Sequence, residues 1–153
     1  MNLQSAQILA LQLFEKHSLL GWKFKFDRAH MRFGCCNFGT KTISISKVLT
    51  ELNSPAKVRD TILHEIAHAL VGKRNAHNLR WKTKAREIGC RAERCYSREE
   101  VQIPRGKYTA SCLNCGKNFQ VLRKRGGVSC RDCCKKFNHG KYSPRFLINF
   151  LEN

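Results

Sequence analysis

The chain has 153 residues, of which 42% are hydrophobic, and this length suits one compact domain with a small appended module. The hydrophobic content excludes a chain that is disordered throughout. The formal net charge is +18, with +4 in residues 1–53, +5 in residues 54–104 and +9 in residues 105–153. An excess this large, concentrated at one end, predicts a polyanionic partner, and nucleic acid is favoured over an anionic membrane surface.

Two further features of the sequence concern the cellular compartment. No apolar run approaches the roughly 20 residues that span a bilayer, and residues 1–17 lack the basic start and the cleavage site of a secretory signal. The nine cysteines are odd in number, and several have the C-x-x-C spacing of metal ligands. We therefore expect a monomeric cytoplasmic protein, at the nucleoid if it is bacterial or viral and in the nucleus if it is eukaryotic.

The N-terminal third of the sequence predicts one helix followed by a small sheet. Residues 1–17 carry apolar side chains in the pattern of an amphipathic helix packed on a core. Residues 22–27 alternate large apolar with polar residues, as a half-buried strand does. A hairpin follows, with strands near residues 31–36 and 41–46 and a turn at residues 37–40. We expect these strands to form an antiparallel sheet.

The second predicted helix has clear signals at both ends. Asn53 or Ser54 can cap its start, and Pro55 fits its first turn. Gly72 ends it, because glycine adopts the backbone conformations that follow a helix more easily than other residues do. Between these ends, the apolar side chains recur at helical spacing.

A third helix and a domain boundary follow. The helix is predicted from about Leu79 to Ile88 and is ended by Gly89. The segment after it has no sustained periodicity, and we interpret it as a linker. We therefore divide the chain into a domain of residues 1–104 and a domain of residues 105–153.

A motif of two histidines and a glutamate lies in the middle of the second helix. His64 and His68 are four residues apart, so both imidazoles lie on one helix face and can reach a single ion. Zinc accepts neutral imidazole nitrogen, and it keeps a position open for water when the protein supplies three ligands. Glu65 lies beside the first ligand, where its carboxylate can take a proton from that water. The helix ends and the apolar flanks disfavour a chance occurrence.

A third ligand to this ion must come from elsewhere in the chain. His77 lies nine residues beyond His68, past the helix-ending Gly72, and a chain that turns back could bring it to the same ion. A glutamate from a later segment, Glu87 or Glu93, is the competing ligand. We prefer His77.

A second cluster consists of two C-x-x-C pairs. Cys112 and Cys115 form the first pair, and Cys130 and Cys133 form the second after 14 intervening residues. Four thiolates complete a tetrahedral zinc site without an open position, so this zinc would be structural, and two pairs at this spacing disfavour a redox motif. Cys134 is adjacent to Cys133 and could replace it. We predict that the four remaining cysteines are buried thiols, with a binding role for the last two as the alternative: Cys35, Cys36, Cys90 and Cys95.

The C-terminal segment interleaves basic residues with aromatic ones. Arg123, Lys124 and Arg125 are predicted to form a basic hairpin tip between the cysteine pairs, and Lys135 and Lys136 follow the second pair. Phosphate contact combined with base stacking is typical of proteins that bind single-stranded nucleic acid. The alternative is a solvated basic face over core aromatic residues. The aromatic residues nearby are Phe119, Phe137 and Tyr142.

Together these motifs resemble the SprT-like (Spartan-type) zinc metallopeptidases. The resemblance runs from about Trp22 to Cys133 and rests on "LHEIAHAL", on "HNLRW" and on "AREIGCRAERC" before the paired cysteines. It implies a zinc-dependent, DNA-stimulated protease that acts on proteins bound or crosslinked to DNA. It also matches Trp81 to an aromatic residue of the family, which we expect to pack under the site.

The resemblance also implies roles for individual residues. By position, His64, His68 and His77 would bind the catalytic zinc, and Glu65 would be the catalytic acid. The chain departs from many members of the family at Asn78, where they have glycine directly after the third histidine. The loop that carries His77 can therefore differ from theirs.

The expected fold is α+β, with a zincin-like helical core and a small antiparallel sheet, followed by a β-rich zinc ribbon with a basic tail. We expect a zinc metalloendopeptidase with two zinc ions per chain, one catalytic and one structural. Its expected partners are DNA, in single-stranded form, and DNA-bound proteins. Two rivals remain: a non-catalytic, zinc-stabilised nucleic-acid-binding protein, and a regulatory protease with one dedicated protein substrate. Glu65 disfavours the first, because a structural zinc site gains nothing from a general base.

Overall fold

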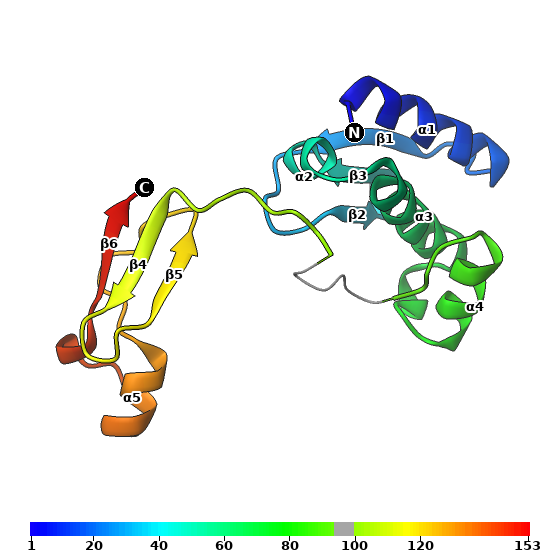
Figure 1. The fold of residues 1–153 in the computed structure, drawn as a ribbon. Coiled ribbons are helices and arrows are strands. Elements are labelled where there is room, and N and C mark those ends of the chain that lie inside the picture. Colours follow the sequence, from blue (N-terminus) through cyan, green and yellow to red (C-terminus); the bar gives the residue numbers. More distant parts are fainter. Residues whose placement is uncertain (94–99) are drawn as a thin grey trace. The chain divides into compact units, whose positions relative to one another are not determined.

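The chain folds into two compact units. The structure is a computed structural model that describes residues 1–93 and 100–153. The first unit is Met1–Pro104 and the second is Arg105–Asn153. Figure 1 shows a first unit that combines helices with a sheet, and a smaller second unit that contains a sheet and a short helix. Among the described residues, no helix has the length and apolar character needed to cross a bilayer.

The first unit combines helices with one three-stranded sheet. Helix α3 is the longest helix described, and it contains the histidine and glutamate motif. The elements in chain order are α1 Leu3–Lys16, β1 Lys23–Asp27, β2 Gly34–Asn37, β3 Thr42–Ser46, α2 Lys47–Leu52, α3 Pro55–Val71, the 3-10 helix η1 Lys73–Asn75 and α4 Leu79–Glu87.

The sheet is mixed, whereas the sequence predicted an antiparallel one. Strands β2 and β3 form the expected antiparallel hairpin, but β1 pairs with β3 in parallel, giving the order β1-β3-β2. After β1, the chain crosses to the opposite edge of the sheet, where it forms β2. Strand β3 then lies between β1 and β2. Side chains stabilise this crossing: Ser44 Oγ donates a hydrogen bond to Asp27 Oδ2 at 2.8 Å, and Ser46 Oγ donates one to the Ala29 carbonyl. Such contacts join distant segments and leave no local sequence pattern.

The core of the first unit lies between α1, the sheet and α3. Every residue of β3 is buried, as expected for the central strand of a sheet with both faces covered. Helix α1 contributes Ala6 and Ala10, which are fully buried and small enough to allow close packing. Helix α3 contributes the fully buried Ile62 and Ile66. Burial on several sides fixes the rotation of α3, and with it the direction in which its polar residues point.

The ends of α3 agree with the sequence prediction. The Ser54 side chain accepts a hydrogen bond from the Lys57 backbone N–H, and Pro55 is the first helical residue. Gly72 follows the helix with φ of 83°, in the left-handed range that favours glycine. Helix α2 was not predicted, because it follows β3 without a break and is capped by Ser46, the last residue of that strand.

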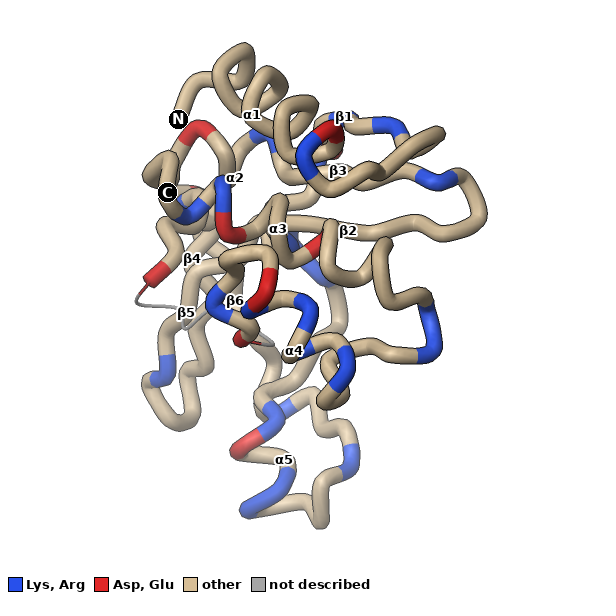
Figure 2. The backbone as a smooth tube through the Cα atoms, turned by 90° about the vertical axis from the view of Figure 1, so that its right-hand side faces the viewer, with Lys and Arg blue, Asp and Glu red and all other residues tan. Residues whose placement is uncertain are grey.

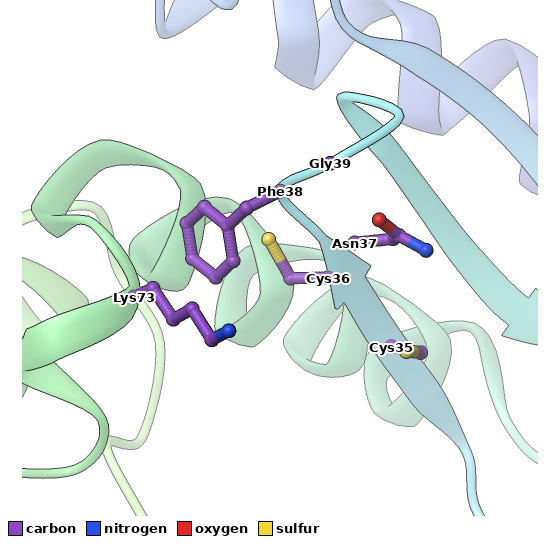
Figure 3. A pocket seen from close by; sticks show the side chains of 6 residues that line it. All are labelled: Cys35, Cys36, Asn37, Phe38, Gly39 and Lys73. Atoms are coloured by element: carbon purple, nitrogen blue, oxygen red, sulfur yellow. The ribbon is translucent and has the colours of Figure 1, made fainter.

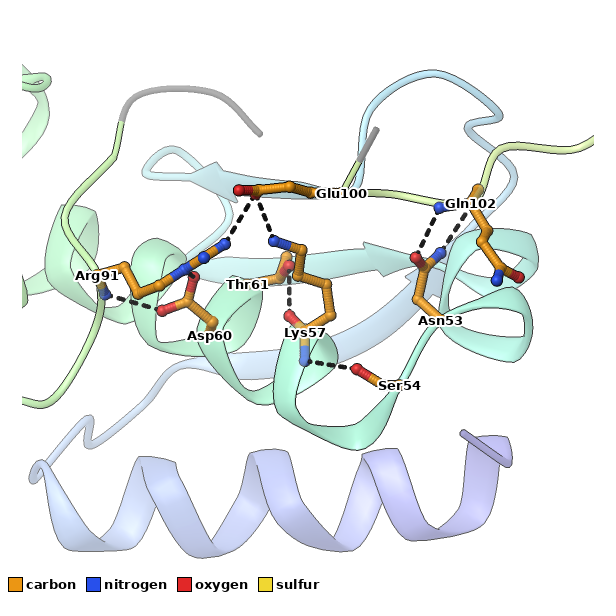
Figure 4. A network of polar contacts seen from close by, with 8 residues as sticks. All are labelled: Asn53, Ser54, Lys57, Asp60, Thr61, Arg91, Glu100 and Gln102. Carbon is orange, nitrogen blue, oxygen red and sulfur yellow. Dashed lines mark hydrogen bonds and ion pairs between the residues drawn. The ribbon is translucent and has the colours of Figure 1, made fainter. Parts of the chain in front are cut away.

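The segment after α4 returns to the N-terminal half of α3, as Figure 4 shows. The Arg91 backbone N–H donates to Asp60 Oδ1 at 2.9 Å. Glu100 Oε2 accepts from Lys57 Nζ at 2.8 Å and from Arg91 Nη2 at 3.0 Å. Further along, Gln102 exchanges two backbone hydrogen bonds with the Asn53 side chain. Both described ends of this segment are therefore attached to α3 or to the turn before it.

The second unit is a small antiparallel sheet with a short helix. Its strand order is β5-β4-β6, and both pairings are antiparallel. Its buried core consists of Phe146 and four cysteines, which is too little apolar surface to stabilise a fold alone. Helix α5 was not predicted, because its seven residues are too few to show a period. The elements are β4 Tyr108–Cys112, β5 Asn118–Val121, α5 Arg131–Phe137, the 3-10 helix η2 Pro144–Phe146 and β6 Ile148–Glu152.

Candidate metal centre and active site

Three imidazole rings converge at the C-terminal half of α3. The Nε2 atoms of His64 and His77 are 3.1 Å apart, those of His68 and His77 are 3.1 Å apart, and those of His64 and His68 are 3.2 Å apart. Ligands about 2.0–2.1 Å from a tetrahedral zinc ion lie about 3.3 Å from one another. The three nitrogens therefore fit one zinc ion with a fourth position left open, and the structure brings His77 to the two histidines of α3.

The turn between α3 and α4 brings His77 back to α3. The Gly72 N–H donates to the His68 carbonyl at 3.0 Å, and the Asn75 side chain donates to the Val71 carbonyl at 2.6 Å. His77 has φ of 57°, in the left-handed range. Asn78, which stands where many family members have glycine, accepts the Trp81 backbone N–H at 3.0 Å and thereby caps α4.

The histidines of α3 are held in the neutral form that binds metal. Burial, and then the neighbouring imidazoles, lower the pKa of His64 to about 4. Burial and His77 likewise lower the pKa of His68 to about 4. A hydrogen bond to the Glu93 backbone acts to raise the pKa of His64. Because the Nε2 atom of His64 faces the other rings, the donor in this hydrogen bond is Nδ1–H. This bond fixes the tautomer and leaves the Nε2 lone pair free for a cation.

Glu65 lies beside this centre, buried under the edge strand β2. The Glu65 residue is 8% exposed. Burial raises the pKa of its carboxyl group to about 7, although the charge of Arg32 and a backbone hydrogen bond from Cys36 act to lower it. A zinc ion at the three imidazoles would also lower the pKa of this carboxyl group. A carboxylate that gains and loses a proton near neutral pH can act as a general base and then as a general acid.

Gly34 allows β2 to approach Glu65 this closely. A Cβ atom at this position would lie 2.5 Å from Glu65 Oε1 and 2.8 Å from its Cγ. Gly34, Arg32 and Cys36 were not predicted from the sequence as neighbours of Glu65. Gly34 was the sequence feature that could have indicated this contact, because glycine inside a strand indicates close approach of another group.

We expect Gly34→Ala to displace Glu65 and to lower peptide hydrolysis by at least about tenfold, because a misplaced catalytic group loses proton-transfer efficiency. Zinc content should stay unchanged, since the three atoms nearest to such a Cβ all belong to Glu65 and not to an imidazole. The measurement is kcat/KM together with elemental zinc analysis. Gly126→Ala is the control, because a Cβ atom there would meet nothing within 4 Å. Equal activity of both variants would contradict the close approach.

Trp81 forms a wall behind the imidazoles, as the resemblance implied. It is fully buried, and its ring centroid lies 4.6 Å from that of His64, 5.1 Å from that of His68 and 4.7 Å from that of His77. Its indole N–H has no hydrogen-bond partner among the described residues. Because one ring touches all three imidazoles, Trp81 limits their rotation and orients them as a set.

The two glutamates that competed with His77 lie outside the cluster of three imidazoles. Glu87 is on α4, where its carboxylate oxygens accept from Lys84 Nζ at 2.8 and 2.7 Å. Glu93 is exposed, and only its backbone interacts with His64. The described residues therefore favour His77 as the third ligand.

We expect His77→Ala to lower the zinc content from about two ions per chain to about one, because two imidazoles alone hold zinc weakly. The four-cysteine site should keep its ion. The exposed His30 provides the control, and His30→Ala should retain both ions. Elemental analysis of freshly purified protein is the measurement. Full zinc content in the His77 variant would mean that the third ligand lies elsewhere.

A pocket of about 230 Å³ lies at strand β2, the strand that covers Glu65. Figure 3 shows the side chains of Cys36, Phe38 and Lys73 converging on it. Cys36 connects the pocket to the centre, because its backbone N–H donates a hydrogen bond to the Glu65 carboxyl group. Burial raises the pKa of the Cys36 thiol to about 12, so this thiol is uncharged near neutral pH. The lining residues are Cys35, Cys36, Asn37, Phe38, Gly39 and Lys73.

The four cysteines of the second unit also converge. Sγ of Cys112 lies 3.7 Å from that of Cys133, and Sγ of Cys115 lies 3.8 Å from that of Cys130. Thiolates about 2.3 Å from a tetrahedral zinc lie about 3.8 Å apart, so the set fits a closed zinc site. Burial raises the pKa of Cys112, but hydrogen bonds from the backbone N–H groups of Cys115 and Asn114 and from the side chains of Cys115 and Cys133 together lower it to about 7.

The other cysteines lie outside this set. Cys134 is buried but faces Ser129 Oγ at 3.1 Å, so Cys133 is the one that joins the cluster. Cys90 is a buried thiol, as predicted, and burial raises its pKa to about 12. Cys35 and Cys36 are partly exposed on the edge strand β2, so the prediction of buried thiols was wrong for them. Cys95 lies outside the described residues.

The candidate nucleic-acid residues are exposed on the second unit. Arg123, Lys124 and Arg125 lie in the loop after β5, whereas the β4–β5 turn belongs to the first cysteine pair, so the predicted basic hairpin tip was wrong. Lys135 and Lys136 are on α5. Phe119, Phe137 and Tyr142 are 44%, 57% and 58% exposed. The Phe137 ring also packs on Phe146 and has Lys136 Nζ 5.2 Å from its centroid. Lys124 Nζ lies 4.7 Å above the Tyr108 ring.

Comparisons with known proteins bear on the first unit. The sequence model of the SprT-like family matches residues 4–103. No curated protein matches the chain. Among solved structures, the chain is similar to the crystal structure of the metallopeptidase zymogen jannalysin of Methanocaldococcus jannaschii, with a TM-score of 0.48 and 17% sequence identity, covering 62% of this chain and 85% of that one. Because the family match spans more than half of the chain, the chain belongs to the SprT-like family.

Proposed function

We propose that the protein is a zinc-dependent metalloprotease that associates with DNA and cleaves proteins bound or crosslinked to it. Membership of the SprT-like family supports a metallopeptidase. The observation that carries the proposal is the placement of Glu65, a buried carboxyl group with a pKa of about 7, beside three imidazoles whose Nε2 atoms lie 3.1–3.2 Å apart.

The residues of the centre suit hydrolysis of a peptide bond. His64, His68 and His77 would hold the zinc ion, which when bound supplies Lewis-acid polarisation of water and of the peptide carbonyl. Glu65 takes a proton from the attacking water and later passes it to the leaving amine. The Cys36 N–H and the packing of Gly34 hold the Glu65 carboxylate in one orientation.

The edge strand β2 offers a place for a substrate peptide. It lies at one edge of the sheet and pairs only with β3 among the described strands. An extended peptide can add to such an edge through backbone hydrogen bonds, which gives affinity without demanding a particular sequence. The pocket at Cys36, Phe38 and Lys73 could then receive one of its side chains.

The second unit supports association with DNA. It carries a net charge of +9, and the exposed basic residues lie on the same small unit as exposed aromatic rings. Phosphate contacts supply affinity, and stacking of unpaired bases on exposed rings favours single-stranded DNA. We propose contacts from Arg123, Lys124, Arg125, Lys135 and Lys136.

A cleavage assay tests the proposal against its two rivals. The native chain and its Glu65→Gln variant are incubated with several DNA-binding proteins, with and without single-stranded DNA. We expect cleavage of several substrates by the native chain only, and faster cleavage with DNA. No cleavage in any condition, despite full zinc content, would favour a non-catalytic DNA-binding protein. Cleavage of one substrate alone, independent of DNA, would favour a regulatory protease.

A further inference from the structure

The turn and helix beside the metal centre carry an unusual concentration of positive charge. Residues 73–86 contain six basic residues and no acidic one. Five of the six are exposed, and Figure 2 shows basic segments along α4. We call these five residues the basic flank: Lys73, Arg74, Arg80, Lys82 and Arg86.

The positions of Arg80 and Lys82 oppose the stability of α4. Arg80 and Lys82 lie in the first part of the helix, where the helix dipole disfavours cations, and the first turn has no acidic residue. Two pairs of like charge are spaced i,i+4, Arg80 with Lys84 and Lys82 with Arg86, and each such pair repels. A basic surface that serves only solubility has no need of this arrangement.

The basic flank also lacks acidic ion-pair partners within the described part of the chain. Lys84 is paired with Glu87 at 2.7 Å, and it is the basic residue of this segment that is not fully exposed. The ion pairs of the described residues do not include the five flank residues. Their charges therefore remain available to an anionic partner.

The basic flank lies next to residues of the metal centre in the chain. His77 lies between its two halves in the chain, and Arg80 and Lys82 stand on either side of Trp81. Trp81 packs on all three imidazoles, with ring centroids 4.6–5.1 Å away. An anionic chain bound to the flank would thus run beside the centre.

We propose that the basic flank binds the phosphate backbone of nucleic acid, so that the catalytic unit contacts DNA independently of the second unit. This inference rests on the proposed association with DNA. A regularly charged polyanion fits better than a single acidic side chain, because the five cations lie along a turn and a helix rather than around one point. The flank would hold DNA next to the centre, and with it any protein attached to that DNA.

The test compares two full-length triple variants that lose the same charge. Arg80, Lys82 and Arg86 are replaced by Gln, a good helix former, in the flank variant. Lys23, Lys25 and Lys47, which are exposed on β1 and α2, are replaced by Gln in the control. In Figure 1, β1 and α2 lie away from α4 within the first unit. Binding of labelled single-stranded and duplex oligonucleotides is measured by fluorescence anisotropy over a salt series.

We expect the flank variant to bind at least about tenfold more weakly at low salt. Its slope of log affinity against log salt should fall by about 0.7–0.9 for each phosphate group that the variant no longer neutralises. Its melting temperature should be equal to the native value or higher, because repulsion within α4 is removed. The control should lose less affinity. Equal losses in both variants, or native affinity in the flank variant, would overturn the proposal.

A third variant separates this inference from the proposed function. In it, Arg123, Lys124 and Arg125 are replaced by Gln. If native protein binds no DNA, the proposed association with DNA fails, and the flank proposal fails with it. If only the third variant loses affinity, DNA association stands and the flank proposal is wrong. Loss of binding to phosphatidylserine vesicles by the flank variant, with unchanged binding to DNA, would identify a membrane partner and would also overturn it.

Discussion

Replacing Glu65 by Gln is expected to reduce peptide hydrolysis by at least about 10²–10⁴-fold, the range that positioned proton transfer contributes. The amide keeps the size of the carboxyl group but can neither take a proton from water nor return one to the leaving amine. Zinc content should be unchanged, because Glu65 is not part of the imidazole cluster. The melting temperature should stay equal or rise slightly, because a neutral amide avoids the cost of burying a charge.

Glu87→Gln is the matched control for this variant. Glu87 carries the same functional group but lies exposed on α4, paired with Lys84 at 2.7 Å. We expect native activity and native zinc content. The two measurements are kcat/KM with a quenched peptide and elemental zinc analysis on the same samples. Retained hydrolysis in the Glu65 variant would assign the general base to another group, and loss of zinc in the Glu87 variant would make Glu87 a ligand.

The parts of the centre that the sequence predicted depend on local geometry. The spacing of His64 and His68 is enough, because any α-helix brings residues four apart to one face. The end of α3 at Gly72 was likewise visible as a glycine after a periodic segment. His77 could be named as a candidate, but its position depends on Asn75 and Asn78, whose side chains shape the turn.

The parts that were missed depend on contacts between distant segments. Burial, to which the covering strand β2 contributes, raises the pKa of Glu65. Arg32 and Cys36, which act to lower that pKa, lie about 30 residues away in the chain. The parallel pairing of β1 with β3 has the same origin, since the chain crosses the sheet before the hairpin begins. Periodicity reports which face of an element is buried, but not which element covers it.

The adjacent cysteines Cys133 and Cys134 provide the second large expected effect. Cys133→Ser should lower the zinc content from about two ions per chain to about one and should unfold the second unit, because structural zinc in small domains supplies about 10–16 kcal/mol of apparent binding free energy. The apolar core of that unit cannot replace this, since it consists of Phe146 and buried cysteines with Ile148 packed against them. Amide spectra should lose the dispersed signals of residues 105–153 and keep those of the first unit.

Cys134→Ser replaces the sulfur of the neighbouring cysteine by oxygen and should leave both zinc ions in place. Cys134 is as buried as Cys133, at 3% exposure each, but its Sγ contacts Ser129 Oγ and lies outside the four-thiolate set. We therefore expect a loss of only about 1 kcal/mol, the usual scale for a buried side chain made slightly more polar. Zinc analysis and thermal melting of both variants distinguish the two sites. If Cys134→Ser loses the ion and Cys133→Ser keeps it, the second cysteine pair binds zinc one residue further along α5 than the structure places it.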